Sequence, residues 1–175
     1  MGFLGCEGVG NRRRCRHDRS GILPPMADGS PTPTHLPRRE PGEFVFSHRL
    51  AVRFRDCDAM GHVNHAVYFT YLEQCRFAWW RHLGGSSGLP GADTIIAHAE
   101  CDYRAPAFVH DELDIRLTLT DCGKSSFTLQ YAILDVATGK RVADARTVSV
   151  TFDYLTGRPV PISDATRRLL LGGRE

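Results

Sequence analysis

The chain has 175 residues, a formal net charge of +2, 24% charged residues and 42% residues of the hydrophobic class. This length predicts one domain, and the near-balanced charge excludes a strong field that would recruit nucleic acid or a membrane surface. The chain has no apolar run long enough to span a bilayer, and its first residues lack the apolar core of a secretory signal. We therefore expect a cytoplasmic protein with reduced cysteines and neither nucleic acid nor membrane as a partner.

Residues 1–42 differ in composition from the rest of the chain. They hold six of the ten prolines, a run of three arginines and few large apolar side chains. Such a segment cannot bury enough surface to offset the entropy of ordering it. We expect a disordered N-terminal extension over 1–42 and one ordered domain over 43–175.

The first ordered element is predicted to be a strand from Phe44 to Phe54, because alternate residues there are apolar or aromatic. A helix is predicted over 66–82, which contains neither glycine nor proline. Asn64 is a candidate helix cap, and Gly84-Gly85 is a candidate stop. Because this helix is apolar at nearly every angle, we expect other structure to enclose it.

Further strands are predicted over 94–104, 112–121, 125–136 and 142–154, followed by a short closing helix in ISDATRRLLLGG. The segment Ala137–Lys140 has the composition of a hairpin turn. Short connections favour antiparallel pairing. The predicted fold class is therefore α+β: a five-stranded antiparallel sheet curled around one long central helix.

Polar residues gather in the loop between the first strand and the helix: Asp56, Asp58, Gly61, His62, Asn64 and His65. The start of a helix exposes unpaired N–H groups and the positive end of the helix dipole, which could stabilise an oxyanion. A carboxylate held nearby could act as a general base or as a nucleophile. The arrangement suits hydrolysis of an activated acyl group.

Three stretches together resemble one family: DCDAMGHVNHAVYFTYLEQCR, GKSSFTLQY and FDYLTGRPVPI. The chain from about Phe46 to Pro161 resembles hotdog-fold acyl-CoA thioesterases of the 4-hydroxybenzoyl-CoA thioesterase type. The resemblance implies a hotdog fold and hydrolysis of an acyl- or aroyl-CoA thioester to free acid and CoA, without a metal or other cofactor. It also implies a homo-oligomer, a dimer with its two helices side by side or a homotetramer of two such dimers. The active site would then lie at the dimer interface.

The resemblance also implies roles for individual residues. Asp58 matches the catalytic aspartate, and His65 matches the residue whose backbone N–H helps to form the oxyanion hole. In some members that residue is a histidine with a catalytic role of its own. Gly61 matches a glycine that lets the loop turn beside the thioester. Lys124 and Ser126 match a segment that approaches the nucleotide of CoA.

Several of these polar residues have structural alternatives. Asp56 could orient the loop by pairing with Arg53 or Arg55, and Asn64 could cap the helix or contact the substrate. His62 could serve only as a hydrogen-bonding group of the loop. The spacing of these histidines and aspartates lacks the helical pair typical of a metal site, so no metal is expected.

Two further residues near this loop need an interpretation. Glu73 is expected to pair with Arg76, although a minority branch of hotdog thioesterases uses a helix glutamate in catalysis. Cys57 lies between two acids, whose charges would raise the pKa of its thiol and make it a poor nucleophile.

An alternative to the enzyme is a non-catalytic acyl-CoA-binding regulatory module, because hotdog domains also serve as ligand sensors. Hydratase chemistry on an enoyl-CoA is a third interpretation. Asp58 at the motif position favours the thioesterase.

Overall fold

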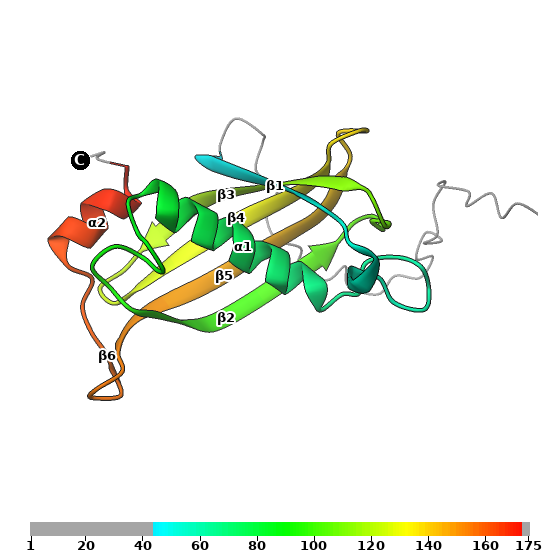
Figure 1. Ribbon diagram of the computed structural model, residues 1–175. Helices are drawn as coiled ribbons and strands as arrows, with labels where there is room; N and C mark the ends of the chain where they lie inside the picture. The colour runs from blue at the N-terminus through cyan, green and yellow to red at the C-terminus, as the bar shows by residue number, and fades with distance from the viewer. Residues whose placement is uncertain (1–43, 173–175) are drawn as a thin grey trace, which may run out of the picture. The chain divides into compact units, whose positions relative to one another are not determined.

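The computed structural model describes residues 44–172, and its helices and strands follow in the predicted order (Figure 1). Strand β1 (Phe46–Ala51) leads through a one-turn 3₁₀ helix, η2 (Phe54–Asp56), to the long helix α1 (Val67–His82). Four strands come next: β2 (Thr94–Tyr103), β3 (Glu112–Cys122), β4 (Ser126–Asp135) and β5 (Arg141–Asp153). The short strand β6 (Arg158–Pro159) and helix α2 (Asp164–Leu170) follow. The extension predicted over 1–42 lies outside the described residues.

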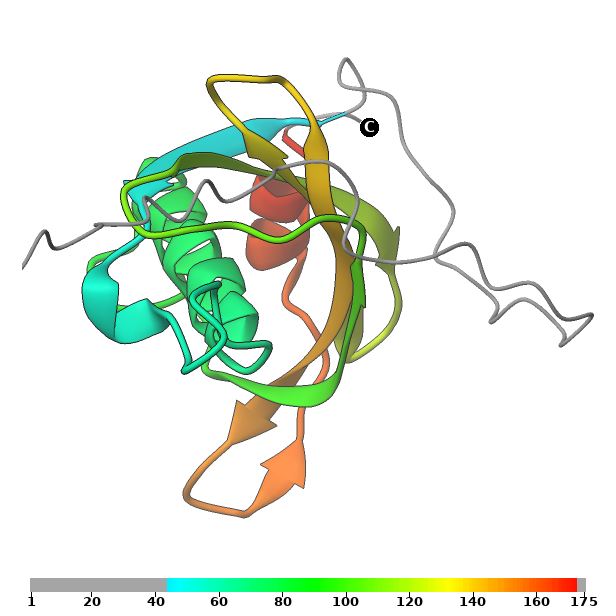
Figure 2. The same cartoon turned by 90° about the vertical axis from the view of Figure 1, so that its right-hand side faces the viewer.

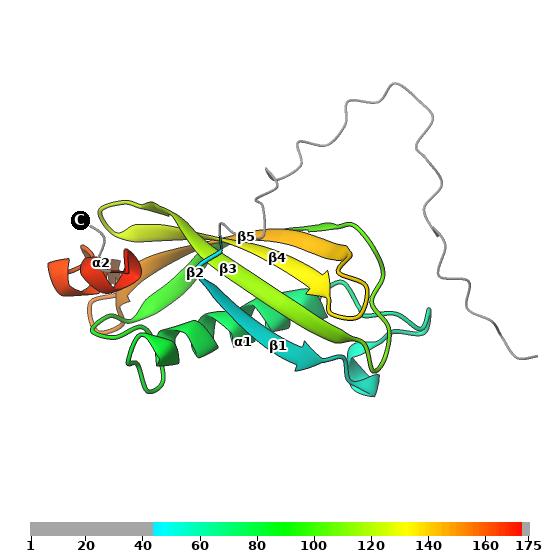
Figure 3. The same cartoon turned by 90° about the horizontal axis from the view of Figure 1, so that it is seen from above.

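The strands form one antiparallel sheet in the order β1-β3-β4-β5-β2, and β6 pairs with β5. Helix α1 lies along the inner face of the curled sheet in views at right angles (Figures 2 and 3). The predicted α+β architecture, a sheet curled around one long helix, is confirmed. The predicted count of five strands missed β6, which has two residues.

The core lies between α1 and the inner face of the sheet. Alternate residues of the central strands are fully buried there: Leu113, Ile115 and Leu117 on β3, and Phe127, Leu129, Tyr131 and Ile133 on β4. Helix α1 contributes Tyr68, Tyr71, Leu72, Cys75, Trp79 and Trp80. Full burial of one such apolar side chain stabilises a fold by about 1.5–3 kcal/mol. This packing fixes α1 on the sheet and gives the loop before it a rigid base.

One side of α1 is not enclosed by its own chain. Phe69, Thr70 and Glu73 are exposed on the side that faces the β2 edge of the sheet. The expectation that this helix is covered all round is therefore wrong for a single copy. No helix within residues 44–172 is both long and apolar enough to cross a membrane.

Some element boundaries differ from the prediction. The first strand ends at Ala51 rather than Phe54, and the Phe54 side chain is 86% exposed because the chain turns outward into η2. Asn64 does not occupy the N-cap position of α1, which belongs to Ala66. The predicted stop is confirmed, since α1 ends at His82 and Gly84 adopts a φ of 97° while its N–H donates to Arg81 O.

Candidate active site

The loop from η2 to α1 is a small hairpin of its own. Cys57 and Val63 form an antiparallel bridge, and the Asp58 N–H donates to His62 O at 3.0 Å. The Val63 N–H donates to Ala107 O at 2.8 Å, which ties this hairpin to the segment before β3. The loop is therefore held at both its base and its side, as a site for positioned chemistry requires.

Asp56 is the buried anchor of this loop, with 3% of its surface exposed. Its carboxylate accepts hydrogen bonds from the Arg53 side chain and backbone N–H, and from the Tyr71 hydroxyl at 2.9 Å. Burial opposes ionisation, but the hydrogen bonds from Arg53 and Tyr71 hold the pKa of Asp56 below its usual value. Asp56 thus pairs with Arg53, one of the two partners that the sequence suggested, and orients the loop.

Asp58 lies at the start of the loop's tight turn, and its side chain is 28% exposed. Oδ1 accepts the Met60 N–H at 2.9 Å, and Oδ2 lies 4.0 Å from His62 Nδ1. The Gly61 N–H donates to Asp58 O, and Gly61 adopts a φ of 81°. A Cβ at Gly61 would meet no atom within 4 Å, so within one chain glycine is needed for its backbone conformation rather than for space.

The start of α1 presents one open amide beside this turn. Asn64 Oδ1 accepts the Ala66 N–H at 2.9 Å, and Asn64 O accepts the Val67 N–H at 3.0 Å. The His65 N–H has no acceptor among the residues that the structure describes. The Tyr103 hydroxyl donates to His65 O at 2.9 Å and so holds the next peptide, between His65 and Ala66. An exposed N–H at a helix start is suited to bind a carbonyl oxygen that gains negative charge.

His62 and Cys57 flank the turn, and neither has contacts within the described residues that indicate a catalytic role. His62 Nδ1 lies 3.4 Å from Val63 O, which fits the loop hydrogen bond considered from the sequence. Burial, and then the charges of Asp56 and Asp58, raise the pKa of the Cys57 thiol. The expectation that Cys57 is a poor nucleophile is therefore confirmed in its direction.

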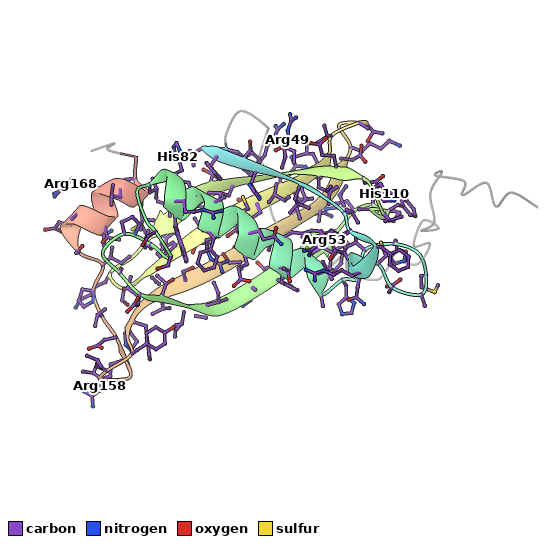
Figure 4. All side chains as sticks on the ribbon, viewed as in Figure 1. Arg49, Arg53, His82, His110, Arg158 and Arg168 are labelled. Carbon is purple, nitrogen blue, oxygen red and sulfur yellow. The ribbon has the colours of Figure 1, made fainter. Side chains whose placement is uncertain are left out.

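Lys124 and Ser126 lie far from Asp58 within one chain. They belong to the β3–β4 hairpin, beside α2, whereas the Asp58 loop contacts the segment just before β3. Strand β3 alone separates these ends by about 33 Å. In Figure 4, Arg53 and His110 mark the Asp58 end of the sheet, and Arg168 on α2 marks the opposite end. One copy therefore brings Asp58, Gly61, Asn64 and His65 together, but not Lys124 and Ser126.

Glu73 lies on α1, away from both the Asp58 loop and the Lys124 hairpin. Its side chain is 56% exposed on α1, and its Oε1 lies 3.8 Å from Arg76 Nη2. The expected pairing with Arg76 is present, but the exposed residue of the pair is the glutamate and the buried one is the arginine.

Two tyrosines of the site escaped the sequence analysis. Tyr71 belongs to the helix predicted over 66–82 and Tyr103 to the strand predicted over 94–104, and neither pattern predicts a contact with the loop. Each carries a hydroxyl that reaches the loop across a long stretch of sequence. No local pattern marks such a contact, because the two partners are brought together only by the packing of α1 and β2.

The described residues include no cluster of three or more histidine, cysteine, aspartate or glutamate side chains that could hold a metal ion. The loop itself presents a part-exposed carboxylate on Asp58 and an open amide on His65 beside a helix start. This set can polarise a carbonyl and either attack it or activate a water molecule.

Comparison with known proteins agrees with this geometry. The thioesterase-like superfamily matches residues 52–170. The 1,4-dihydroxy-2-naphthoyl-CoA hydrolase of Trichodesmium erythraeum is 33% identical over 136 residues, covering 72% of this chain and 95% of the relative. The long-chain acyl-CoA thioesterase FadM of Escherichia coli is 28% identical over 127 residues, covering 70% and 94%.

A solved structure supports the same assignment. The crystal structure of a Thermus thermophilus thioesterase complexed with coenzyme A and zinc has a TM-score of 0.65 and 30% identity, covering 73% of this chain and 98% of that one. The family match over residues 52–170 includes α1 and β2 to β5, and the solved structure shares the fold, so the predicted hotdog fold is confirmed. The chain belongs to the thioesterase-like superfamily, and the prediction of a thioester hydrolase is thereby confirmed.

Proposed function

We propose that this protein hydrolyses an acyl-CoA thioester to a free acid and CoA, with Asp58 as the catalytic carboxylate. The supporting observation is the placement of a part-exposed carboxylate and an open His65 amide on one braced loop. Oδ1 is occupied by the Met60 N–H, so Oδ2 is the oxygen available for reaction. CoA in the Thermus thermophilus complex supports CoA as the carrier here.

The reaction follows from these groups. The thioester carbonyl accepts the His65 N–H, which stabilises the oxyanion as the carbonyl carbon becomes tetrahedral. As a general base, Asp58 takes a proton from a water molecule while the water oxygen attacks the carbonyl carbon. Collapse of the tetrahedral intermediate breaks the C–S bond, and the proton passes from Asp58 to the thiolate of CoA. As a nucleophile, Asp58 forms a mixed anhydride and expels the thiolate, and water then hydrolyses the anhydride. Both routes give a free acid and CoA.

A second copy of the chain would complete the site. Strand β2 forms one edge of the sheet, and residues 96–99 on it are exposed. Antiparallel pairing of two β2 edges would continue the sheet and set the open sides of both α1 helices near each other. Because the two β2 strands would run in opposite directions, the Lys124 hairpin of each copy would lie near the Asp58 loop of the other. We therefore propose a homodimer, with a homotetramer as its further assembly.

A cytoplasmic location is proposed from the state of the cysteines and from the substrate. The four cysteines within the described residues, Cys57, Cys75, Cys101 and Cys122, are free thiols. Free thiols and a CoA thioester substrate support a reducing, cytoplasmic location.

The deciding experiment measures release of free thiol from acyl-CoA by wild type and by Asp58→Asn. The substitution keeps the size of the side chain but removes its charge and basicity, so kcat should fall by about 10²–10⁴-fold. Binding of a non-hydrolysable acyl-CoA analogue should stay near wild type, because the His65 amide remains. Single turnover in ¹⁸O-water tests for the nucleophile route, since label enters Asp58 only when a mixed anhydride forms and water attacks its aspartyl carbonyl. If the wild-type protein binds the analogue but releases no thiol, it is instead the non-catalytic regulatory module. If Asp58→Asn retains more than about a tenth of wild-type activity, Asp58 is not the catalytic residue.

A further inference from the structure

A hollow of about 280 Å³ lies between the open side of α1 and the sheet. Its walls come from α1, from β2 and from Thr147 on β5: Phe69, Thr70, Leu72, Glu73, Arg76, Ile96, Ala99 and Thr147. Most of this surface is apolar, which suits an acyl group. Among its lining residues, Phe69 lies in the first turn of α1, four positions after His65.

Arg76 is an unusual residue for such a wall. It is only 6% exposed, and its Nε is buried without a hydrogen-bond partner. Its ion pair with Glu73 is long, at 3.8 Å, and Glu73 is largely solvated, so the pair is weak. The guanidinium also lies over the Trp80 ring, 5.4 Å from its centroid. A buried cation whose donors are incompletely used is costly unless a further acceptor pairs with it.

Apart from its long pair with Glu73, Arg76 has no ion pair with a carboxylate within residues 44–172. The buried Tyr131 hydroxyl lies beside it; burial raises the pKa of Tyr131, while the charge of Arg76 opposes that rise. A protonated tyrosine is neutral and cannot compensate the guanidinium. The acceptor best matched to the planar fork of an arginine is a carboxylate.

We infer that this hollow takes the acyl group of the substrate and that Arg76 binds a carboxylate at its distal end. The inference rests on the proposed function and narrows the substrate to CoA thioesters of dicarboxylic acids. From the rise of an α-helix, the guanidinium lies about 10–15 Å from the helix start. An extended acyl chain of medium length therefore spans from the His65 amide to Arg76, and the incoming carboxylate replaces the solvated Glu73 at the guanidinium.

The test compares matched substrates that differ only in the distal carboxylate: hexanoyl-CoA with adipoyl-CoA, octanoyl-CoA with suberoyl-CoA, and decanoyl-CoA with sebacoyl-CoA. Wild type should favour one of the carboxylated partners by about 10–100-fold in kcat/KM, as expected for a charged hydrogen-bonded pair. Arg76→Met should abolish this preference, so that the two substrates of each pair are hydrolysed with similar kcat/KM. Arg76→Lys, which keeps the charge but loses the fork, should retain part of it.

Two further variants serve as controls, one expected to leave the carboxylate preference unchanged and one expected to increase it. Thr70→Val changes the same hollow without touching a charge and should leave the carboxylate preference unchanged. Glu73→Gln removes the competing anion and should increase the preference by a few fold. An unaltered ratio in Arg76→Met, or equal loss on both substrates of a pair, would give Arg76 a structural role only and overturn the inference.

A binding measurement separates this inference from the hydrolase function. Isothermal titration of wild type should show tighter binding of free sebacate than of decanoate, and Arg76→Met should remove the difference. If no acyl-CoA is hydrolysed but this difference is present, the carboxylate site stands and the proposed hydrolysis falls. If decanoyl-CoA is hydrolysed and neither kinetics nor binding favours the carboxylate, the hydrolysis stands and the carboxylate site falls.

Discussion

The Tyr71 hydroxyl donates a 2.9 Å hydrogen bond to Asp56 Oδ2, so the first two turns of α1 hold the loop that precedes them. Burial, and then the neighbouring carboxylate, raise the pKa of Tyr71, and the hydroxyl therefore stays a donor. The Asp56 backbone O accepts the Asn64 N–H, and Asn64 lies three positions before Val67, where α1 begins. Through its carboxylate and its backbone O, Asp56 thus connects η2, the loop and α1.

Asp56→Asn should lower the free energy of unfolding by about 2–3 kcal/mol, because it leaves Arg53 without its charged partner and weakens the bond to Tyr71. Tyr71→Phe, the matched change on the other side, should cost about 1–1.5 kcal/mol. Urea denaturation of both single variants and the double variant measures the coupling. Additive losses would show that the hydroxyl and the carboxylate do not support each other.

The contribution of Asp56 to stability should depend on pH in a defined direction. Its pKa in the folded protein lies below the unfolded value of 3.8, so its stabilisation is fully present above that value and is lost as pH falls through the lower folded pKa. The difference in melting temperature between wild type and Asp56→Asn should thus be constant near neutral pH and shrink in acid. A difference that grows in acid would contradict the depressed pKa.

Local periodicity predicted most of the fold because each pattern reports one physical constraint. Leu113, Ile115 and Leu117 alternate since successive strand residues point to opposite faces, and all three are fully buried. The end of α1 was visible in Gly84, which adopts the positive φ that glycine favours. Phe54 continued the alternation by chance, and only the outward turn at η2 shows it as exposed.

The site was less accessible to sequence reasoning because its parts come from distant segments. The loop from Asp58 to His65 was visible as one motif. The hydrogen bond from Tyr103 to His65 joins residues 38 positions apart, and no local pattern encodes it. The sequence also could not predict that Lys124 lies at the opposite end of the sheet from Asp58. A motif gives the order of residues along the chain but not the distance in space between two motifs.

Tyr103→Phe should lower kcat more than it changes KM. Burial raises the pKa of Tyr103 to about 12, so in wild type its hydroxyl donates to His65 O throughout the working pH range. Removing that bond loosens the His65–Ala66 peptide, which adjoins the peptide that carries the His65 N–H, and a loss of about 3–10-fold in kcat corresponds to one neutral hydrogen bond. Steady-state kinetics of thiol release measure both constants. An unchanged kcat would show that the His65 peptide is held without this hydroxyl.

Gly61→Ala should impair the turn without a clash. The φ of 81° is unfavourable for alanine, at a cost of about 1–2 kcal/mol, although its Cβ would have open space. We expect a fall in melting temperature together with lower kcat, because the Asp58 carboxylate is positioned by this turn. Gly157→Ala, at a φ of 68° in the β5–β6 turn, is the matched control and should reduce stability by a similar amount without affecting kcat.

Lys124→Ala should raise KM for acyl-CoA by several fold with little change in kcat, as expected for a contact that binds substrate and transition state alike. The effect should shrink at high salt, because screening weakens the wild-type contact. Lys140→Ala removes another exposed lysine, from the β4–β5 turn, and serves as the control.

Lys124→Ala also tests whether a second copy of the chain completes the site. Mixed oligomers of Lys124→Ala and Asp58→Asn subunits contain two kinds of site if Asp58 of one copy works with Lys124 of the other. One kind carries both substitutions and is inactive, whereas the other carries neither and should show the wild-type KM. If both residues served one site from the same copy, every active site of the mixture would lack Lys124 and show the raised KM. Kinetics of the mixed and the unmixed variants therefore distinguish a shared site from one built within a single chain.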